Sequence, residues 1–213
     1  YPQYSPDGKE LAFIEDRSRL MVLNLETQKV RQVTDGSTWF NTGGGFDYSW
    51  SPDGKWFTLE FTGNRHDPYT DIGIVSAQGG KVVNLTNSGY TSGSPRWTLD
   101  GNAILFITER YGMRAHASWG SLNDVMLVFM NQDAYDKFRL SKEDYELQKE
   151  LEKEQKSTAE AKKNDKKKGD NKDKPEEKKE EKTKDIVVEL DNIEDRIVRL
   201  TPNSSDLGSA IIT

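Results

Sequence analysis

A turn of the form aromatic-Ser-Pro-Asp-Gly-Lys recurs at a regular interval, and it constrains the fold of this chain more than any other feature. Its copies begin at Tyr4, Trp50 and Trp97, which are 46 and 47 positions apart. In such a turn Pro fixes φ, Asp can bond the backbone and Gly accepts a positive φ, so the chain reverses between two strands. Leu99 replaces Pro in the third copy. The fixed position of the three aromatic residues predicts that they pack in a core.

Each turn is followed by three short segments rich in Val, Ile, Leu and Phe. They are residues 11–14, 20–25 and 30–34 in repeat one, 56–61, 71–75 and 82–86 in repeat two, and 103–107, 124–129 and 197–201 in repeat three. Together with the strand before the turn, this makes four strands per repeat, the pattern of a β-propeller blade. We therefore predict an all-β chain of about three four-stranded antiparallel blades.

Three blades are too few to close a propeller ring, which takes typically about four to eight. An open set of blades would leave two bare sheet edges. The sequence also starts within a first strand, and a fourth repeat is expected to begin at residues 209–212. We expect the ring to be incomplete and the remaining blades to lie outside this sequence.

Repeat three carries an insertion between its third and fourth strands. Residues 132–162 have helical periodicity, and Ser141 with Asp144 resembles a capping box that starts a second helix. Residues 165–184 are almost entirely charged or polar, which predicts a solvated linker or a frayed helix. The insertion could dock a charged partner, but its mixed charge favours a tolerated hydrophilic insertion. The predicted domains are thus 1–130 (blades one, two and part of three), 131–184 (the insertion) and 185–213 (the end of blade three and the start of a fourth).

The composition argues against several kinds of site. The net charge is −6, there is no cysteine, and His66 and His116 are the two histidines. No thiol nucleophile or disulfide is therefore available, and no apolar run approaches the roughly 20 residues that span a bilayer. No Gly-x-Ser-x-Gly elbow, phosphate loop or paired-histidine motif occurs. We predict no catalytic residue, metal or cofactor in this chain, and no binding of nucleic acid.

Two connectors carry the candidate binding residues. Arg65 and His66 lie between the second and third strands of repeat two, while Arg114, His116 and Trp119 lie in the equivalent connector of repeat three. A guanidinium can bind a carboxylate through two hydrogen bonds, so these residues are predicted to hold peptides. In the alternative interpretation they are loop residues that bond to one another and to the turn backbone.

The repeat, with its Trp-Ser-Pro-Asp-Gly-Lys turn and Leu-Thr ending, resembles the PD40-type propeller repeats of TolB-like and tricorn-like proteins. The third repeat is more specific, because it resembles bacterial tricorn-type peptidases of the S41 serine-peptidase family. The segments that carry this resemblance are 112–121, 123–125, 134–143 and 191–196, followed by 199–201.

This resemblance implies an exported, periplasmic protein with propeller blades, a PDZ-like domain and a catalytic domain that bears the serine nucleophile. No segment of this chain matches the catalytic domain. The chain would then gate or hold peptides or unfolded protein segments, with the other blades and domains of the parent protein as its partners. Two other functions stay open: a TolB-like scaffold for protein–protein interaction, and the propeller of a prolyl-oligopeptidase-like hydrolase.

Overall fold

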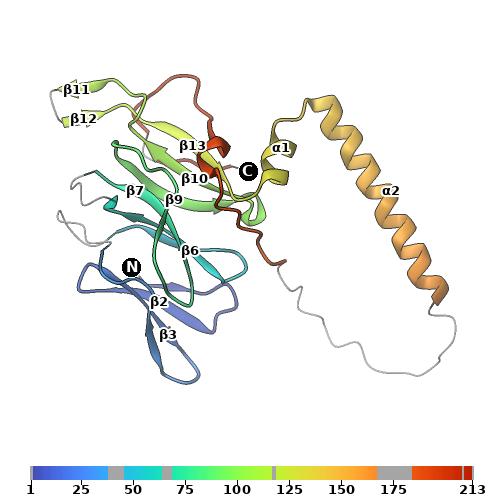
Figure 1. The fold of residues 1–213 in the computed structure, drawn as a ribbon, viewed down its shortest axis with the longest axis horizontal. Helices are drawn as coiled ribbons and strands as arrows, with labels where there is room; N and C mark the ends of the chain where they lie inside the picture. The colour runs from blue at the N-terminus through green and yellow to red at the C-terminus, as the bar shows by residue number, and fades with distance from the viewer. Residues whose placement is uncertain are drawn as a thin grey trace. The chain divides into compact units, whose positions relative to one another are not determined.

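Three four-stranded antiparallel sheets follow one another along the chain in a computed structural model that describes residues 2–37, 46–63, 69–116, 119–166, 184–207 and 209–212 (Figure 1). Sheet one contains β1 (Gln3–Tyr4), β2 (Glu10–Glu15), β3 (Arg19–Asn24) and β4 (Val30–Gln32); sheet two contains β5 (Tyr48–Trp50), β6 (Trp56–Phe61), β7 (Asp71–Ser76) and β8 (Val83–Asn84); sheet three contains β9 (Ser92–Thr98), β10 (Ala103–Thr108), β13 (Asp124–Phe129) and β14 (Ile197–Arg199). Each strand pairs with the next strand of its own sheet. The predicted all-β fold of four-stranded units is confirmed.

Apolar side chains fill the spaces between successive sheets. The first core joins repeats one and two, and consists of Ala12, Leu20, Val22, Val33, Phe46, Tyr48, Trp50, Phe57, Leu59, Phe61, Val75 and Ala77. The second joins repeats two and three, and consists of Ile72, Ile74, Leu85, Ile104, Phe106, Met126, Val128, Met130 and Ile193. Sheet two contributes to both cores, so its two faces are covered. For this reason β7 is buried along almost its whole length instead of alternating between buried and exposed residues.

The first two Ser-Pro-Asp-Gly-Lys turns have the same hydrogen bonds. Ser5 Oγ donates to Asp7 Oδ1 over 2.6 Å, and Ser51 Oγ donates to Asp53 Oδ1 over the same distance. The backbone N–H two residues beyond each Asp, at Lys9 and Lys55, donates to the same Oδ1 atom over 3.1 Å. The third turn, without Pro and Ser, forms instead a 3₁₀ turn, η2 (Leu99–Gly101).

The repeated aromatic residues do not share one environment. Trp50 is buried, and its ring lies 4.0 Å from that of Phe57 while its Nε1 donates to the carbonyl of Gln3. Trp97 is partly buried against the second core. Tyr4 is 67% exposed, so the prediction that it packs in the core is wrong. The physical reason is that β1 is the first described strand, and no earlier sheet of the described chain covers it.

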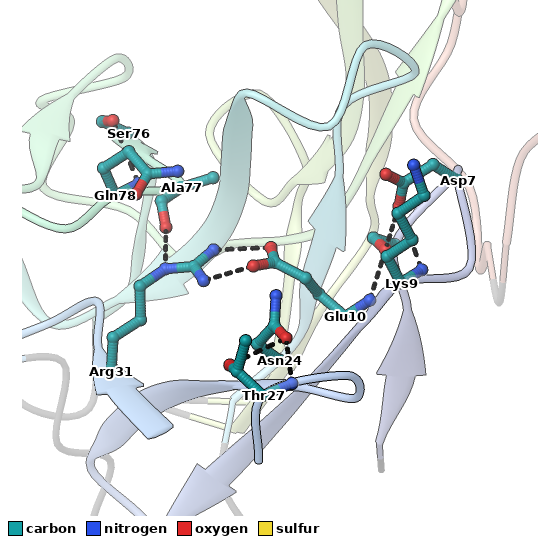
Figure 2. A network of polar contacts seen from close by, with 10 residues as sticks. Asp7, Lys9, Glu10, Asn24, Thr27, Arg31, Ser76, Ala77 and Gln78 are labelled. Carbon is teal, nitrogen blue, oxygen red and sulfur yellow. Dashed lines mark hydrogen bonds and ion pairs between the residues drawn. The ribbon is translucent and has the colours of Figure 1, made fainter. Parts of the chain in front are cut away.

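Arg31 links the first two sheets (Figure 2). Its guanidinium forms a two-pronged ion pair with Glu10, and its Nε donates to the carbonyl of Ala77 over 3.0 Å. The hydrogen bonds from Arg31 hold the pKa of Glu10 below its usual value. A charge-assisted fork of this kind fixes position as well as contributing energy.

The insertion after β13 forms a second compact region. The chain divides into residues 1–132 with 183–213, and residues 133–182. The second region contains α1 (Gln132–Phe138, which begins one residue earlier) and α2 (Lys142–Lys166). Ser141 Oγ accepts from the N–H of Asp144 and donates to its carboxylate, so the predicted capping interaction is present. Most of the segment 165–184 lies outside the described residues.

The end of the chain differs from its prediction. Residues 209–212 form no strand within the described part of the chain, although a fourth repeat was expected to start there. The first strand of each described blade pairs with the second strand of the same blade, and no such second strand follows residues 209–212 in the described part of the chain. Isolated pairing of this region is confined to Asn123 and Ser205, whose backbones exchange hydrogen bonds of 2.8 and 3.0 Å.

Candidate functional site

The connector between β10 and β13 carries the predicted residues of repeat three. It forms a two-stranded hairpin, β11 (Arg114–His116) and β12 (Trp119–Ser121), in which Arg114 pairs with Ser121 and His116 pairs with Trp119 (Figure 1). Arg114 is exposed. The side chains of His116 and Trp119 lie outside the described parts, and so do Arg65 and His66 altogether.

A buried aspartate holds the base of this connector. Asp124, the first residue of β13, is fully buried and accepts hydrogen bonds from Thr201 (2.7 Å), Ser204 (2.8 Å) and Arg199 (3.0 Å). Burial alone would raise its pKa, but these bonds outweigh burial and hold the pKa of Asp124 below its usual value. Its carboxylate therefore ties the start of the third strand to the end of the fourth.

Repeat two has the same arrangement. Asp71, the first residue of β7, accepts from Thr86 Oγ1 over 2.6 Å and from Asn84 Nδ2 over 2.8 Å. The backbone N–H of Ser88 donates to the same carboxylate. The Leu-Thr ending of the repeat thus has a structural role, because its threonine binds the aspartate that begins the third strand.

The exposed part of the connector joins cationic and apolar side chains. Tyr111 is 49% exposed, and the guanidinium carbons of Arg110 and Arg199 lie 5.5 and 5.2 Å from its ring centroid. Met113 is 78% exposed, and its carbonyl accepts the N–H of Leu122. We call Arg110, Tyr111, Met113, Arg114 and Leu122 the arginine surface.

Gly112 allows the two arms of this connector to approach. A Cβ at this position would lie 2.5 Å from the carbonyl carbon of Leu122, closer than real side chains come. Any larger residue would push Tyr111 and Met113 away from Leu122. The glycine therefore places the arms of the arginine surface side by side.

The arginines of this surface differ from Arg199 in whether an acidic side chain pairs with them. Arg199 is paired with the carboxylate of Asp124 at 2.8 Å. By contrast, Arg110 and Arg114 have no acidic partner among the described residues, and both are exposed. The Arg110 guanidinium lies over a half-exposed aromatic ring, and the same connector exposes a second arginine and a thioether. This combination suits a ligand that has both a carboxylate and apolar groups.

Arg114 was a candidate from the sequence and stays a prediction, whereas the other residues of the arginine surface and the two aspartates were not selected. The repeated Asp at the start of the third strand and the repeated Thr at the end of the fourth were a usable signal for the bonds of Asp71 and Asp124. Nothing in the sequence indicated the contact between Tyr111 and Arg199, which depends on how β13 and β14 pair. Among the described residues, no group of His, Asp and Glu side chains is arranged to hold a metal ion.

Comparison with known proteins decides the architecture. No protein-family model matches the chain. A search of solved structures matches the tricorn protease over 96% of this chain and 17% of that one, with a TM-score of 0.56 and 11% identity. The three sheets are β-propeller blades. The resemblance to tricorn-type propellers is thereby confirmed at the level of the fold.

Two further proteins are similar to these blades. The chain is 31% identical over 120 residues to the uncharacterized peptidase YuxL of Bacillus subtilis (strain 168), which covers 49% of this chain and 16% of that protein. TolB from Acinetobacter baumannii matches 62% of this chain and 30% of its own, with a TM-score of 0.44 and 23% identity. The blades thus span about one-sixth of the peptidases to which they are similar.

The blades present two different ends. In blade three, the η2 turn lies where β10 starts and the arginine surface lies where β10 stops, so they occupy opposite ends of the sheet. The arginine surface therefore lies at the end of the blades where, in blade two, β6 stops and β7 starts. Within the described ranges, no helix is long and apolar enough to cross a membrane.

Proposed function

We propose that this chain is a non-catalytic set of propeller blades that holds peptides for the catalytic domain of a larger peptidase. The observation that carries the proposal is the arginine surface, where Arg110 lies over a half-exposed Tyr111 and Arg114 is exposed in the same connector. Neither arginine has an acidic partner among the described residues. The peptidase name of the similar Bacillus protein supports the catalytic context.

The proposed domain composition, cellular location and ligands follow from the resemblance to tricorn-type peptidases that the sequence shows. The catalytic domain would be of the S41 serine-peptidase type, preceded by a PDZ-like domain, and the whole protein would be exported to the periplasm. Peptides or unfolded protein segments would be the ligands, and Arg65, His66, His116 and Trp119 would line the same end of neighbouring blades as Arg114. Fractionation of cells that express the tagged full-length protein tests the location.

Replacing Arg114 by alanine should weaken peptide binding roughly tenfold or more, since a charge-assisted hydrogen bond contributes about 1.5–3 kcal/mol. The probe is a fluorescein-labelled, flexible octapeptide with a free C-terminal carboxylate, and fluorescence anisotropy gives its Kd. The same peptide with an amidated C-terminus should bind the unchanged protein about as weakly as the free-acid peptide binds Arg114→Ala.

The matched control is Arg17→Ala, which removes another exposed arginine from a turn of blade one. It should leave the Kd unchanged, and both variants should keep the melting temperature of the unchanged protein because exposed substitutions have small effects. A melting temperature that falls in Arg114→Ala while the Kd stays constant would show that Arg114 supports the loop instead of binding peptides.

A further inference from the structure

Asp185 and Ile186, which follow the insertion, bind to the Ser-Pro-Asp-Gly-Lys turn of blade two. The backbone N–H of Ile186 donates to Asp53 Oδ2 over 3.0 Å, and Lys55 Nζ lies 2.6 Å from the carboxylate of Asp185. The Ile186 side chain packs on Gly101, since a Cβ there would lie 2.7 Å from Ile186 Cγ1. The Asp185-Ile186 pair therefore lies between the turns of blades two and three.

The receiving site consists of four residues, which we call the second notch: Pro52, Asp53, Lys55 and Gly101. Pro52 closes one side, because its Cδ lies 3.5 Å from a Cβ built on Gly101. Asp53 uses Oδ1 to hold its own turn and keeps Oδ2 for the incoming N–H. Each of the four residues thus has one task in binding the Asp-Ile pair.

Blade one repeats this site. Asp7 has the same internal bonds as Asp53, and the turn glycines Gly8 and Gly54 share a φ of 69°. Pro6 Cδ lies 3.7 Å from a Cβ built on Gly54, as Pro52 does beside Gly101. Pro6, Asp7, Lys9 and Gly54 therefore form the first notch, one blade away from the second.

In the described part of the chain, the first notch has the binding groups of the second, and no segment is bound to them. Among the described residues, the two hydrogen bonds to the Asp7 side chain end on Oδ1, and no carboxylate pairs with Lys9. Around Gly54, Pro6 Cδ is the described atom within 4 Å of a built Cβ. The acceptor, the cation and the space for an apolar side chain are all present. Figure 2 shows Asp7 and Lys9 together at this turn.

We propose that the first notch binds an extended segment of another protein in which Asp or Glu directly precedes Ile, Val or Leu. The acid would pair with Lys9, the N–H of the apolar residue would donate to Asp7 Oδ2, and the apolar side chain would cover Gly54. Because the notch lies at the end of the blades opposite to the arginine surface, this proposal does not depend on the proposed function.

A peptide with the sequence of residues 184–190, acetylated and amidated, is the probe, and NMR titration of the isotope-labelled 213-residue chain is the measurement. We expect the amide signals of Lys9 and Gly54 to shift on titration. Lys9→Glu should weaken binding about fivefold or more, because repulsion replaces an exposed ion pair. A peptide with Asp185→Lys should bind Lys9→Glu better than it binds the unchanged chain.

Lys55→Glu is the matched control, because it makes the same change in the notch that is already filled. It should leave the peptide affinity of the first notch unchanged. The proposal would be overturned if Lys9→Glu and the unchanged chain bound the peptide with equal affinity. It would also be overturned if only the signals of Lys55 and Gly101 shifted, because the peptide would then be replacing the chain's own Ile186 in the second notch. The proposal would likewise be overturned if the Gly54 signal shifted only after residues 141–182 were deleted. That result would mean that a segment of the chain itself occupies the first notch.

Discussion

Arg196→Ala should lower the free energy of unfolding by about 3–5 kcal/mol, measured by urea denaturation. The Arg196 side chain is almost fully buried, at 4% exposure, and its guanidinium donates to the carbonyls of Phe129, Glu189 and Asp191. The alanine variant leaves these buried carbonyls without a donor and opens a cavity. The free energy of unfolding of Arg196→Lys should lie between those of the unchanged chain and Arg196→Ala. A lysine ammonium cannot donate to all three carbonyls as the planar guanidinium does.

The same substitution should loosen the segment that fills the second notch. Glu189 anchors this segment through its carbonyl on Arg196 and its N–H on Met130, three residues from Ile186. Amide hydrogen exchange at Ile186 should therefore accelerate in Arg196→Ala, while Arg17→Ala should change neither the exchange nor the stability. A loss of less than about 1 kcal/mol in Arg196→Ala would contradict the assigned role.

Asp124→Ala should lower the free energy of unfolding by about 2–4 kcal/mol, because it strips the acceptor from Arg199, Thr201 and Ser204. Arg199 is partly exposed and can regain water, which keeps the loss below that of Arg196. Asp71→Ala, at the same place in blade two, should have a comparable effect. The exposed Asp206→Ala should change stability by no more than about 0.5 kcal/mol.

The pH dependence of Asp124 follows from its lowered pKa. A carboxyl whose folded pKa lies below its unfolded value, about 3.9, stabilises the fold above that pH. This contribution is lost as the pH falls through the folded pKa. Asp124→Asn should therefore lose less stability than the unchanged chain when the pH drops below about 4. Identical acid denaturation profiles would count against the bonds assigned to Asp124.

The sequence predicted the blades because their determinants are local. The spacing of Trp50 and Trp97, the Ser-Pro-Asp-Gly turns and the apolar strands all act within one repeat. Tyr4 was predicted wrongly because its burial depends on a neighbouring blade rather than on its own repeat. The hairpin of β11 and β12 lay within a predicted connector, and no Asn-Gly or Asp-Gly turn marks it in the sequence.

The candidate site was less predictable, because it depends on contacts between distant residues. Tyr111 meets Arg199 only after the insertion has returned the chain to β14. Ile186 meets Asp53 across 133 positions of sequence, and its segment adjoins a stretch whose mixed charge suggested no contact with the blades. Arg114 could be selected from the repeat itself, since it lies in a connector equivalent to that of Arg65.

If these blades hold peptides without cleaving them, binding without cleavage should be seen when both are measured in one sample. The labelled free-acid octapeptide is incubated with the 213-residue chain, anisotropy reports capture, and mass spectrometry of the same sample reports the length of the peptide. Capture should weaken as salt screens the guanidinium groups, and the peptide should keep its full mass. A peptide that never binds would contradict the claim, as would cleavage that a substitution within residues 1–213 abolishes.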